Sequence, residues 1–293
     1  MKSLTPPESA TLTLPGKQRQ RFGNRRHRTL WTIGACVVFL AAVILSSQIL
    51  GDAGLNPSLG DRNQPPNLAH PFGTDWLGRD MLTRTLHGLS LSLCIGLLAA
   101  GFSAVIGTVL GIISGTVGGK VDAVVTWIID VFFSLPHLVL LIMIAFAVGG
   151  GTSGVIIAVA LTHWTSLARI IRAEVLQVSS SNYVQLAYKL GHSPLWVARH
   201  HMIPHVIPQL LVGLILLFPH AILHEAALTF IGIGLSPHTP AIGIILAESM
   251  RHLSTGYWWL GVLPGVALLI AVKAFDILGE NLRTLLDPKT SQD

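Results

Sequence analysis

The chain has 293 residues, of which 51% are hydrophobic and only 11% are charged, and its mean hydropathy is +0.63. Soluble domains carry about a quarter charged residues, so this composition excludes an ordinary soluble domain and indicates a polytopic helical membrane protein. The formal net charge of +5 comes from basic residues that flank the apolar runs, which indicates orientation in membrane lipid and no binding of nucleic acid.

The N-terminal segment 1–29 is polar and basic, and an apolar run of spanning length follows at 30–50. A cleaved signal peptide is the alternative interpretation, but Gln48-Ile49-Leu50 is a poor small-residue cleavage site. We expect an uncleaved first span with a cytoplasmic N-terminal tail, because basic residues stay on the cytoplasmic side. These basic residues are Lys17, Arg19, Arg21, Arg25, Arg26 and Arg28.

Five further apolar runs predict an all-α membrane domain of six helices. The segment 51–88 is polar and slightly acidic, as expected for an extracytoplasmic loop, and the core then extends over 89–280. Six spans place both termini in the cytoplasm, including a tail at 281–293. The further spans are predicted at 90–117, 121–148, 155–171, 208–231 and 258–278, with a short amphipathic piece at 242–253.

Small residues and isolated polar residues mark positions within these spans. Pro136 is expected to kink the third span. The two cysteines, Cys36 and Cys94, lie in apolar runs and form neither a disulfide framework nor a metal-ligand spacing. A row of glycines on the second span is expected to allow close helix packing. These glycines are Gly96, Gly101, Gly107, Gly111 and Gly115.

The segment 174–207 between the fourth and fifth spans is polar and basic. Ser181 or Asn182 can cap a helix that runs to Leu190, and Gly191 follows where a helix end favours a left-handed residue. The sequence therefore predicts a helix, a glycine turn and a return to the membrane on the cytoplasmic side.

A second short helix is expected after the glycine turn. Ser193 can cap this helix, and Pro194 occupies its first position, where the missing N–H has no cost. Pro204 is expected to interrupt the chain before the next apolar run.

This segment resembles the EAA loop of ATP-binding cassette (ABC) importer permeases. That pattern has Glu-Ala-Ala, a glycine four residues after the second alanine, and a proline thirteen residues after the glycine. Ala187, Gly191 and Pro204 hold this spacing. Gln185 and Leu186 replace the acid and the first alanine, so another contact with the ATPase must take the place of the acid.

Three other stretches are similar to the dipeptide, oligopeptide and nickel permeases of this class. They resemble in particular the second of the two permease subunits, which has an extended N-terminal tail. The resemblance covers nearly the whole chain beyond residue 30. The stretches lie at 70–80, 225–235 and 281–288.

The resemblance implies ATP-driven import by alternating access through a type I importer permease in the cell (inner) membrane. Its implied partners are a second permease subunit in a heterodimer, two ATPase subunits and an extracytoplasmic solute-binding protein. The implied substrate is a peptide, nickel or a metal chelate.

The chain lacks a phosphate-binding loop of the form G-x-x-x-x-G-K-[ST]. In the nearest candidate, around Lys120, Ser114 replaces the first glycine and Val121 replaces the final Ser or Thr. We therefore expect ATP to be hydrolysed by partner subunits, and the chain to be no enzyme and to hold no cofactor.

In this mechanism, residues 193–200 form the helix inserted into the ATPase, with Trp196 as its apolar anchor. The alternative is an ordinary loop between helices, although such loops are usually shorter. The residues expected to couple the chain to the ATPase are Ala187, Gly191, Ser193, Pro194, Leu195, Trp196 and Pro204.

His220 and His224 are four residues apart and so share one face of a helix at membrane depth. One interpretation places them in the translocation path as ligands of nickel or zinc, a pair also similar to one in nickel-type permeases. The other gives them inter-helix hydrogen bonds. Glu225 follows directly and is a further candidate for the translocation path, but it also resembles the family pattern, which favours a packing or gating role.

Two acidic residues in the spans have candidate partners. Asp130 is expected either to face the translocation path or to pair with Lys273 or Arg169. Asp276 is expected to pair with Lys273, three residues earlier on the sixth span.

The outer loop carries a signature that is expected to fold into an ordered cap. Asp80 can cap the helix that leads into the second span. Docking of an extracytoplasmic binding protein is the alternative role for the same residues. They are Gly73, Thr74, Asp75, Gly78, Arg79 and Asp80.

Two other protein classes are alternatives. An ion-coupled secondary transporter would need no ATPase, and the absence of an internal repeat gives it little support. A membrane scaffold without transport is the second. Vanadate-sensitive uptake distinguishes the importer from the first, and loss of uptake after Gly191 becomes a bulky β-branched residue counts against the second.

Overall fold

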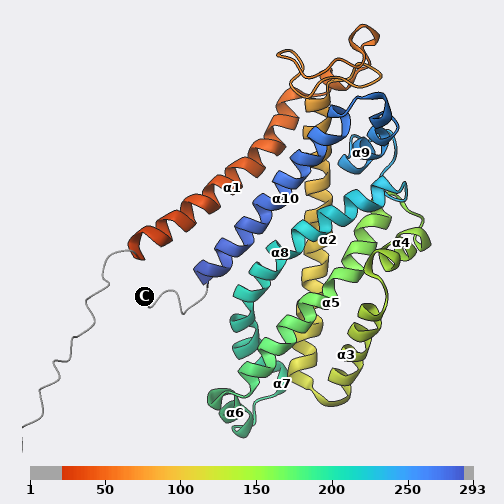
Figure 1. Ribbon diagram of the computed structural model, residues 1–293. Coiled ribbons are helices and arrows are strands. Elements are labelled where there is room, and N and C mark those ends of the chain that lie inside the picture. Colours follow the sequence, from red (N-terminus) through yellow and green to blue (C-terminus); the bar gives the residue numbers. More distant parts are fainter. Residues whose placement is uncertain (1–21, 287–293) are drawn as a thin grey trace, which may run out of the picture.

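The computed structural model describes residues 22–286, which are built almost entirely of helices (Figure 1). The β-structure in this part of the chain is limited to an isolated β-bridge between Thr74 and Asp80. The predicted all-α class is therefore confirmed. Three short 3-10 turns, η1 (Ala53–Leu55), η2 (Leu59–Asp61) and η4 (Leu253–Thr255), lie in the loops. The remaining elements are α1 (Phe22–Leu50), α2 (Met81–Val117), α3 (Gly119–Ser134), α4 (His137–Ala147), α5 (Gly151–Ser179), α6 (Asn182–Lys189), α7 (Pro194–Val197), the π-helical turn η3 (Ala198–Met202), α8 (Ile203–Phe230), α9 (Ile242–Met250) and α10 (Trp259–Leu286).

Within residues 22–286, five helices are long and apolar enough to cross a membrane, and the pair α3–α4 passes the same test as a bent unit. Helices α2 and α5 pack in parallel, because Gly107 of α2 lies against Trp164 of α5 and Gly115 lies against Val175. Parallel neighbours require the chain between them to return to its starting side. The α3–α4 pair is therefore a broken sixth span, in agreement with the predicted count.

The break in this span is sharper than the predicted kink at Pro136, since α3 and α4 meet at 100°. A proline disfavours helical geometry in the preceding residue. Leu135 accordingly has extended dihedral angles, φ −97° and ψ 143°, and Pro136 stands at the N-cap of α4. The break places His137, the first residue of α4, on the wall of the cavity described below.

The predicted glycine face of α2 packs closely, with one exception. A β-carbon at Gly107, Gly111 or Gly115 would lie 2.7–2.8 Å from atoms of α5. At Gly96 it would lie 2.7 Å from a side chain of α8, whereas Gly101 faces open space. Four of the five glycines therefore permit contacts that any side chain would obstruct.

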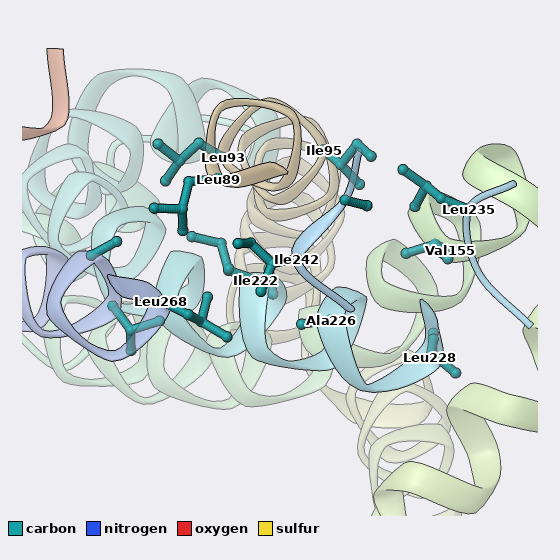
Figure 2. Close-up of a cluster of buried hydrophobic side chains, with 14 of the residues drawn as sticks. Leu89, Leu93, Ile95, Val155, Ile222, Ala226, Leu228, Leu235, Ile242 and Leu268 are labelled. Carbon is teal, nitrogen blue, oxygen red and sulfur yellow. The ribbon is translucent and has the colours of Figure 1, made fainter. Parts of the chain in front are cut away.

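The main hydrophobic core lies where α2, α8, α9 and α10 meet (Figure 2). Leu89 and Leu93 of α2 lie in this cluster together with Ile222 of α8, Ile242 of α9 and Leu268 of α10. Helix α8 contributes to this core and also to the wall of the cavity.

Several helices extend beyond their predicted apolar runs. Helix α2 begins at Met81, inside the predicted loop 51–88, and α10 continues to Leu286, inside the predicted tail. Helical hydrogen bonds do not need an apolar sequence, so a span continues past the lipid boundary. Helix α9 lies within the predicted amphipathic piece 242–253 and ends at Met250, three residues before its predicted end. Lys17, Arg19 and Arg21, and the end of the motif at 281–288, lie outside the described residues.

Candidate coupling segment and translocation cavity

The glycine turn after α6 has the predicted geometry. Gly191 has a φ of +85°, and its N–H donates to the carbonyl of Tyr188 at 3.0 Å. The N–H of His192 donates to the carbonyl of Ala187 at 3.2 Å, so the end of α6 is closed by two backbone bonds. Ser181 occupies the N-cap position, but its hydroxyl donates backward to a carbonyl of α5.

The next helix begins as predicted but does not stop at Pro204. The side chain of Ser193 accepts a bond from the N–H of Trp196 at 3.3 Å, and Pro194 stands in the first turn of α7. Through η3 the helix then continues without a break to the end of α8. The predicted interruption at Pro204 is wrong. The N–H of Ile203 donates to the carbonyl of Ala198, five residues back, so the hydrogen-bond register of the helix changes just before Pro204. The missing N–H of Pro204 therefore does not break the helix.

One face of this segment, α6–α7, is buried against α5. Val184, Val197 and Met202 are fully buried and belong to the same hydrophobic cluster as Ile171 and Val175 of α5. This packing fixes the segment to the bundle.

The opposite face of the segment is apolar and exposed. The exposed fractions are 56% for Leu186, 70% for Leu190 and 81% for Leu195, with Tyr183 at 51%. Within the described residues, the ring of Tyr183 also contacts that of His201, with centroids 5.4 Å apart. Exposed apolar groups gathered on a short polar segment mark a contact surface. We call Tyr183, Leu186, Leu190 and Leu195 the elbow surface.

Trp196, the predicted anchor, lies against two histidine rings of the same segment. Its ring is half-buried and stacked between the rings of His192 and His200, with centroids 3.7 Å and 4.3 Å away. Its stacked position rigidifies α7 and leaves Leu195 as the projecting side chain.

A cavity of about 750 Å³ lies between the α3–α4 break, α5, α8 and the end of α10. His220 and His224 line it. Asp130 and Glu225 are not among its lining residues. Asp130 instead lies 3.3 Å from Arg169, which is one of its expected partners.

Glu225 is fully buried, and its Oε1 accepts a bond from the hydroxyl of Thr229 at 2.9 Å. This position accords with the expected packing role. At the inner end of α10, Lys273 lies 3.8 Å from Asp276, which confirms the predicted pairing.

Two histidines that no sequence pattern singled out lie beside His224. His137 is the first residue of α4, and His163 lies in the middle of α5. The three ring centroids are 4.8–5.0 Å apart, and one nitrogen from each ring lies within 4.8 Å of the others. His220 lines the same cavity but is outside this group, so the structure changes the membership of the candidate metal set.

The outer loop is organised around a buried carboxylate, Asp75. It accepts bonds from Arg79 Nε and Arg84 Nη1, both at 2.7 Å. Arg84 also donates to Glu248 of α9 at 2.8 Å, which ties the loop to a segment distant in the sequence. The sequence motif pointed to Asp75 and Arg79 but gave no signal for Arg84 and Glu248, because their roles depend on tertiary proximity.

The other signature residues also fold the loop. Asp80 caps α2 as predicted, with Oδ1 accepting from the N–H of Thr83 at 2.7 Å. Gly73 and Gly78 have φ of +71° and +75°, and a β-carbon there would lie 2.6 Å and 1.7 Å from a backbone oxygen. The hydroxyl of Thr74 accepts a bond from a backbone N–H at 2.8 Å. The expected folding role of the signature is therefore confirmed.

Comparison with known proteins agrees with this architecture. Residues 107–292 match the family described as binding-protein-dependent transport system inner membrane component. A Brucella suis biovar 1 protein whose name describes a peptide transport system permease is 36% identical over 99% of this chain and 98% of its own. The dipeptide transport system permease protein DppC of Bacillus subtilis is 34% identical over 79% of this chain and 72% of its own.

Two further comparisons extend this result. The glutathione transport system permease protein GsiD of Escherichia coli is 33% identical over 90% of this chain and 88% of its own. The crystal structure of an amino acid ABC transporter with histidines matches with a TM-score of 0.53 at 18% identity, over 69% of this chain and 94% of that chain. That likeness concerns the fold.

A bundle of six spans around a cavity, with an exposed elbow surface at one end, is the architecture of a membrane transport subunit. The protein belongs to the family of inner membrane components of binding-protein-dependent transport systems. It is a multi-pass permease subunit of an ABC importer, a transport component and not an enzyme, and ATP is hydrolysed by a separate subunit.

Proposed function

We propose that this chain pairs with a second permease subunit and forms half of the path by which an importer carries peptides into the cell. The names of its relatives, which specify peptide, dipeptide and glutathione transport, support this substrate class. A cavity of about 750 Å³ is in the size range of sites for small organic ligands. Its wall is mostly apolar, and Gln209 and Arg283 are available to a peptide amide and a carboxylate.

One observation carries the mechanism: the helix that begins at Pro194 continues unbroken to Phe230. Leu195 projects from one end of this helix, and His224 lines the cavity about 40 Å away along it, at 1.5 Å per residue. We therefore expect a force applied at Leu195 to reach the cavity wall through this helix. Alternating access follows when that force changes with the nucleotide state of the ATPase.

The proposed assembly contains two permease subunits, two ATPase subunits and a solute-binding protein in the cell inner membrane. The ATPase contacts the elbow surface, and the binding protein docks on the outer cap around Asp75. Arg26 and Arg28 at the start of α1, with Lys189 and Arg199 at the elbow, support a cytoplasmic location of both regions and of both termini.

Reconstitution of the whole transporter in proteoliposomes tests this function. Uptake of a labelled dipeptide is expected to require ATP on the ATPase side, to stop with vanadate, and to persist when ionophores collapse the ion gradients. Uptake that follows an ion gradient without ATP would instead establish the ion-coupled alternative.

A second candidate substrate, a metal chelate, is favoured by one specific observation. Three histidines gather on the cavity wall, which a path for simple peptides does not need.

A further inference from the structure

Three imidazoles from three separate helices meet at the cavity. His137 comes from the α3–α4 break, His163 from α5 and His224 from α8. The closest approach is 3.2 Å, between His163 Nε2 and His224 Nδ1. Polar side chains at membrane depth are costly and usually serve a partner or a transported group.

Backbone carbonyls orient two of these rings for coordination. His163 Nδ1 lies 3.1 Å from the carbonyl of Val159, and His224 Nδ1 lies 2.8 Å from the carbonyl of His220. A carbonyl only accepts, so in the neutral rings Nδ1 carries the proton and Nε2 holds the lone pair. The Nε2 lone pair of His163 then accepts the N–H of His224, and coordination of a metal by His163 requires that bond to open. Metal-binding histidines are held in the same way, with one nitrogen fixed by a backbone or carboxylate acceptor and the other free.

A hydrogen bond between His163 and His224 accounts for two of the rings but not for the third. His137 makes no side-chain hydrogen bond within residues 22–286, yet its ring lies edge-on to both of the others. Asp130 does not complete the group, because it pairs with Arg169 and does not line the cavity. The cluster is therefore a set of neutral nitrogen donors without a carboxylate.

We propose that His137, His163 and His224 form a transient site for a borderline divalent metal ion, such as Ni²⁺ or Zn²⁺, which the importer carries as a complex with a small peptide. The transport of the metal rests on the proposed function, whereas the binding of the metal to the three histidines is independent of it. Imidazole suits zinc, copper, iron and nickel, whereas magnesium and calcium prefer oxygen ligands.

The geometry is that of a site for cargo. Metal–nitrogen bonds of about 2.0–2.1 Å put ligand nitrogens about 3.3 Å apart in a tetrahedron. The three nitrogens here lie within 4.8 Å, so coordination needs a contraction of about 1.5 Å. Rotation of imidazole rings permits this movement, and His137 stands beside a break in its span. Three protein ligands leave positions that the donor atoms of a peptide can fill.

The test measures binding of Ni²⁺ or Co²⁺ alone to the purified transporter, prepared without a polyhistidine tag, by equilibrium dialysis and by X-ray absorption. The variants are His137→Ala, His163→Gln, which keeps a polar side chain, and His224→Ala. His238→Ala, in an exposed outer loop, is the matched control. His220→Ala distinguishes the three-histidine set from the pair on α8.

Wild-type protein is expected to bind one ion per chain with imidazole scattering in the absorption spectrum. Each variant of the three should lose at least about tenfold in affinity, while His238→Ala and His220→Ala change it less than about twofold. Wild-type binding no tighter than that of the triple variant would overturn the proposal. So would a loss at His220 equal to that at His163, with His137 unaffected.

ATP-driven uptake of a metal-free dipeptide, measured on the same preparations, keeps the two proposals separate. Peptide uptake without metal binding removes this inference and leaves the proposed function in place. Metal binding without ATP-driven uptake of either the peptide or its nickel complex removes the proposed function and leaves the metal site in place.

Discussion

Gly191 offers the sharpest test of the coupling segment, because its conformation and its surroundings make separate predictions. Its φ of +85° is disfavoured for residues with a β-carbon, yet a β-carbon there would meet no atom within 4 Å. Any effect of substitution within this chain must therefore come from backbone strain and not from a clash. Left-handed geometry costs about 1–2 kcal/mol for an ordinary residue and less for asparagine.

The series Gly191→Asn, Gly191→Ala and Gly191→Val should accordingly show graded loss of coupling. We expect a change within about 0.5 kcal/mol for asparagine, about 1 kcal/mol for alanine and about 2 kcal/mol for β-branched valine. The two larger values correspond to roughly fivefold and thirtyfold smaller populations of molecules with the native turn at residue 191. ATP-driven uptake and vanadate-sensitive ATPase activity in proteoliposomes report this population, and thermal unfolding of the bundle serves as the control.

The contrary result is a Gly191→Asn variant that loses as much ATP-driven uptake as Gly191→Val. That outcome would show that space at the ATPase interface, and not the left-handed turn, requires glycine. Full activity of the valine variant would show that the turn is not needed for coupling at all.

Three further predictions concern packing, charge and the elbow surface. Asp75→Ala should lower the free energy of unfolding by about 3–5 kcal/mol in chemical denaturation, because Arg84 then stays buried with one partner. Asp52→Ala, at an exposed site, is the control. A loss below about 1 kcal/mol for Asp75→Ala would contradict this prediction. Gly111→Val should lower the free energy of unfolding by about 1–3 kcal/mol, since the new β-carbon would lie 2.8 Å from a carbonyl of α5. Gly101→Val, whose β-carbon faces open space, should cost much less. Equal melting temperatures of the two variants would show that the contact of α2 with α5 does not require glycine. Leu195→Glu should leave stability within about 0.5 kcal/mol while weakening co-purification of the ATPase subunit, and unchanged co-purification would remove Leu195 from the interface.

Local signals in the sequence predicted the coupling segment well. The positive φ of Gly191, the Ser193 cap and the position of Pro194 each depend on a few neighbouring residues. Pro204 was mispredicted because the same local rule ignores the π-helical turn, which shifts the hydrogen-bond register just before the proline.

Long-range features were less accessible. Pro136 signalled a change of direction, but the 100° angle is set by the packing of α4 against α5 and α8. His137 and His163 appear in the sequence as single polar residues in apolar runs, and their spacing has no helical or metal-ligand pattern. Only the tertiary fold brings them to His224. Arg84 and Glu248 likewise meet Asp75 through the fold.

The central claim is that a separate ATPase binds the elbow surface and moves α8. Cross-linking from Leu195→Cys in native membranes tests this most directly, in a background where Cys36 and Cys94 are replaced. The account predicts capture of a nucleotide-binding subunit, with a yield that changes between ATP and vanadate, and none from Leu253→Cys in the outer loop. Failure to capture such a subunit from Leu195, or equal capture from Leu253, would contradict it.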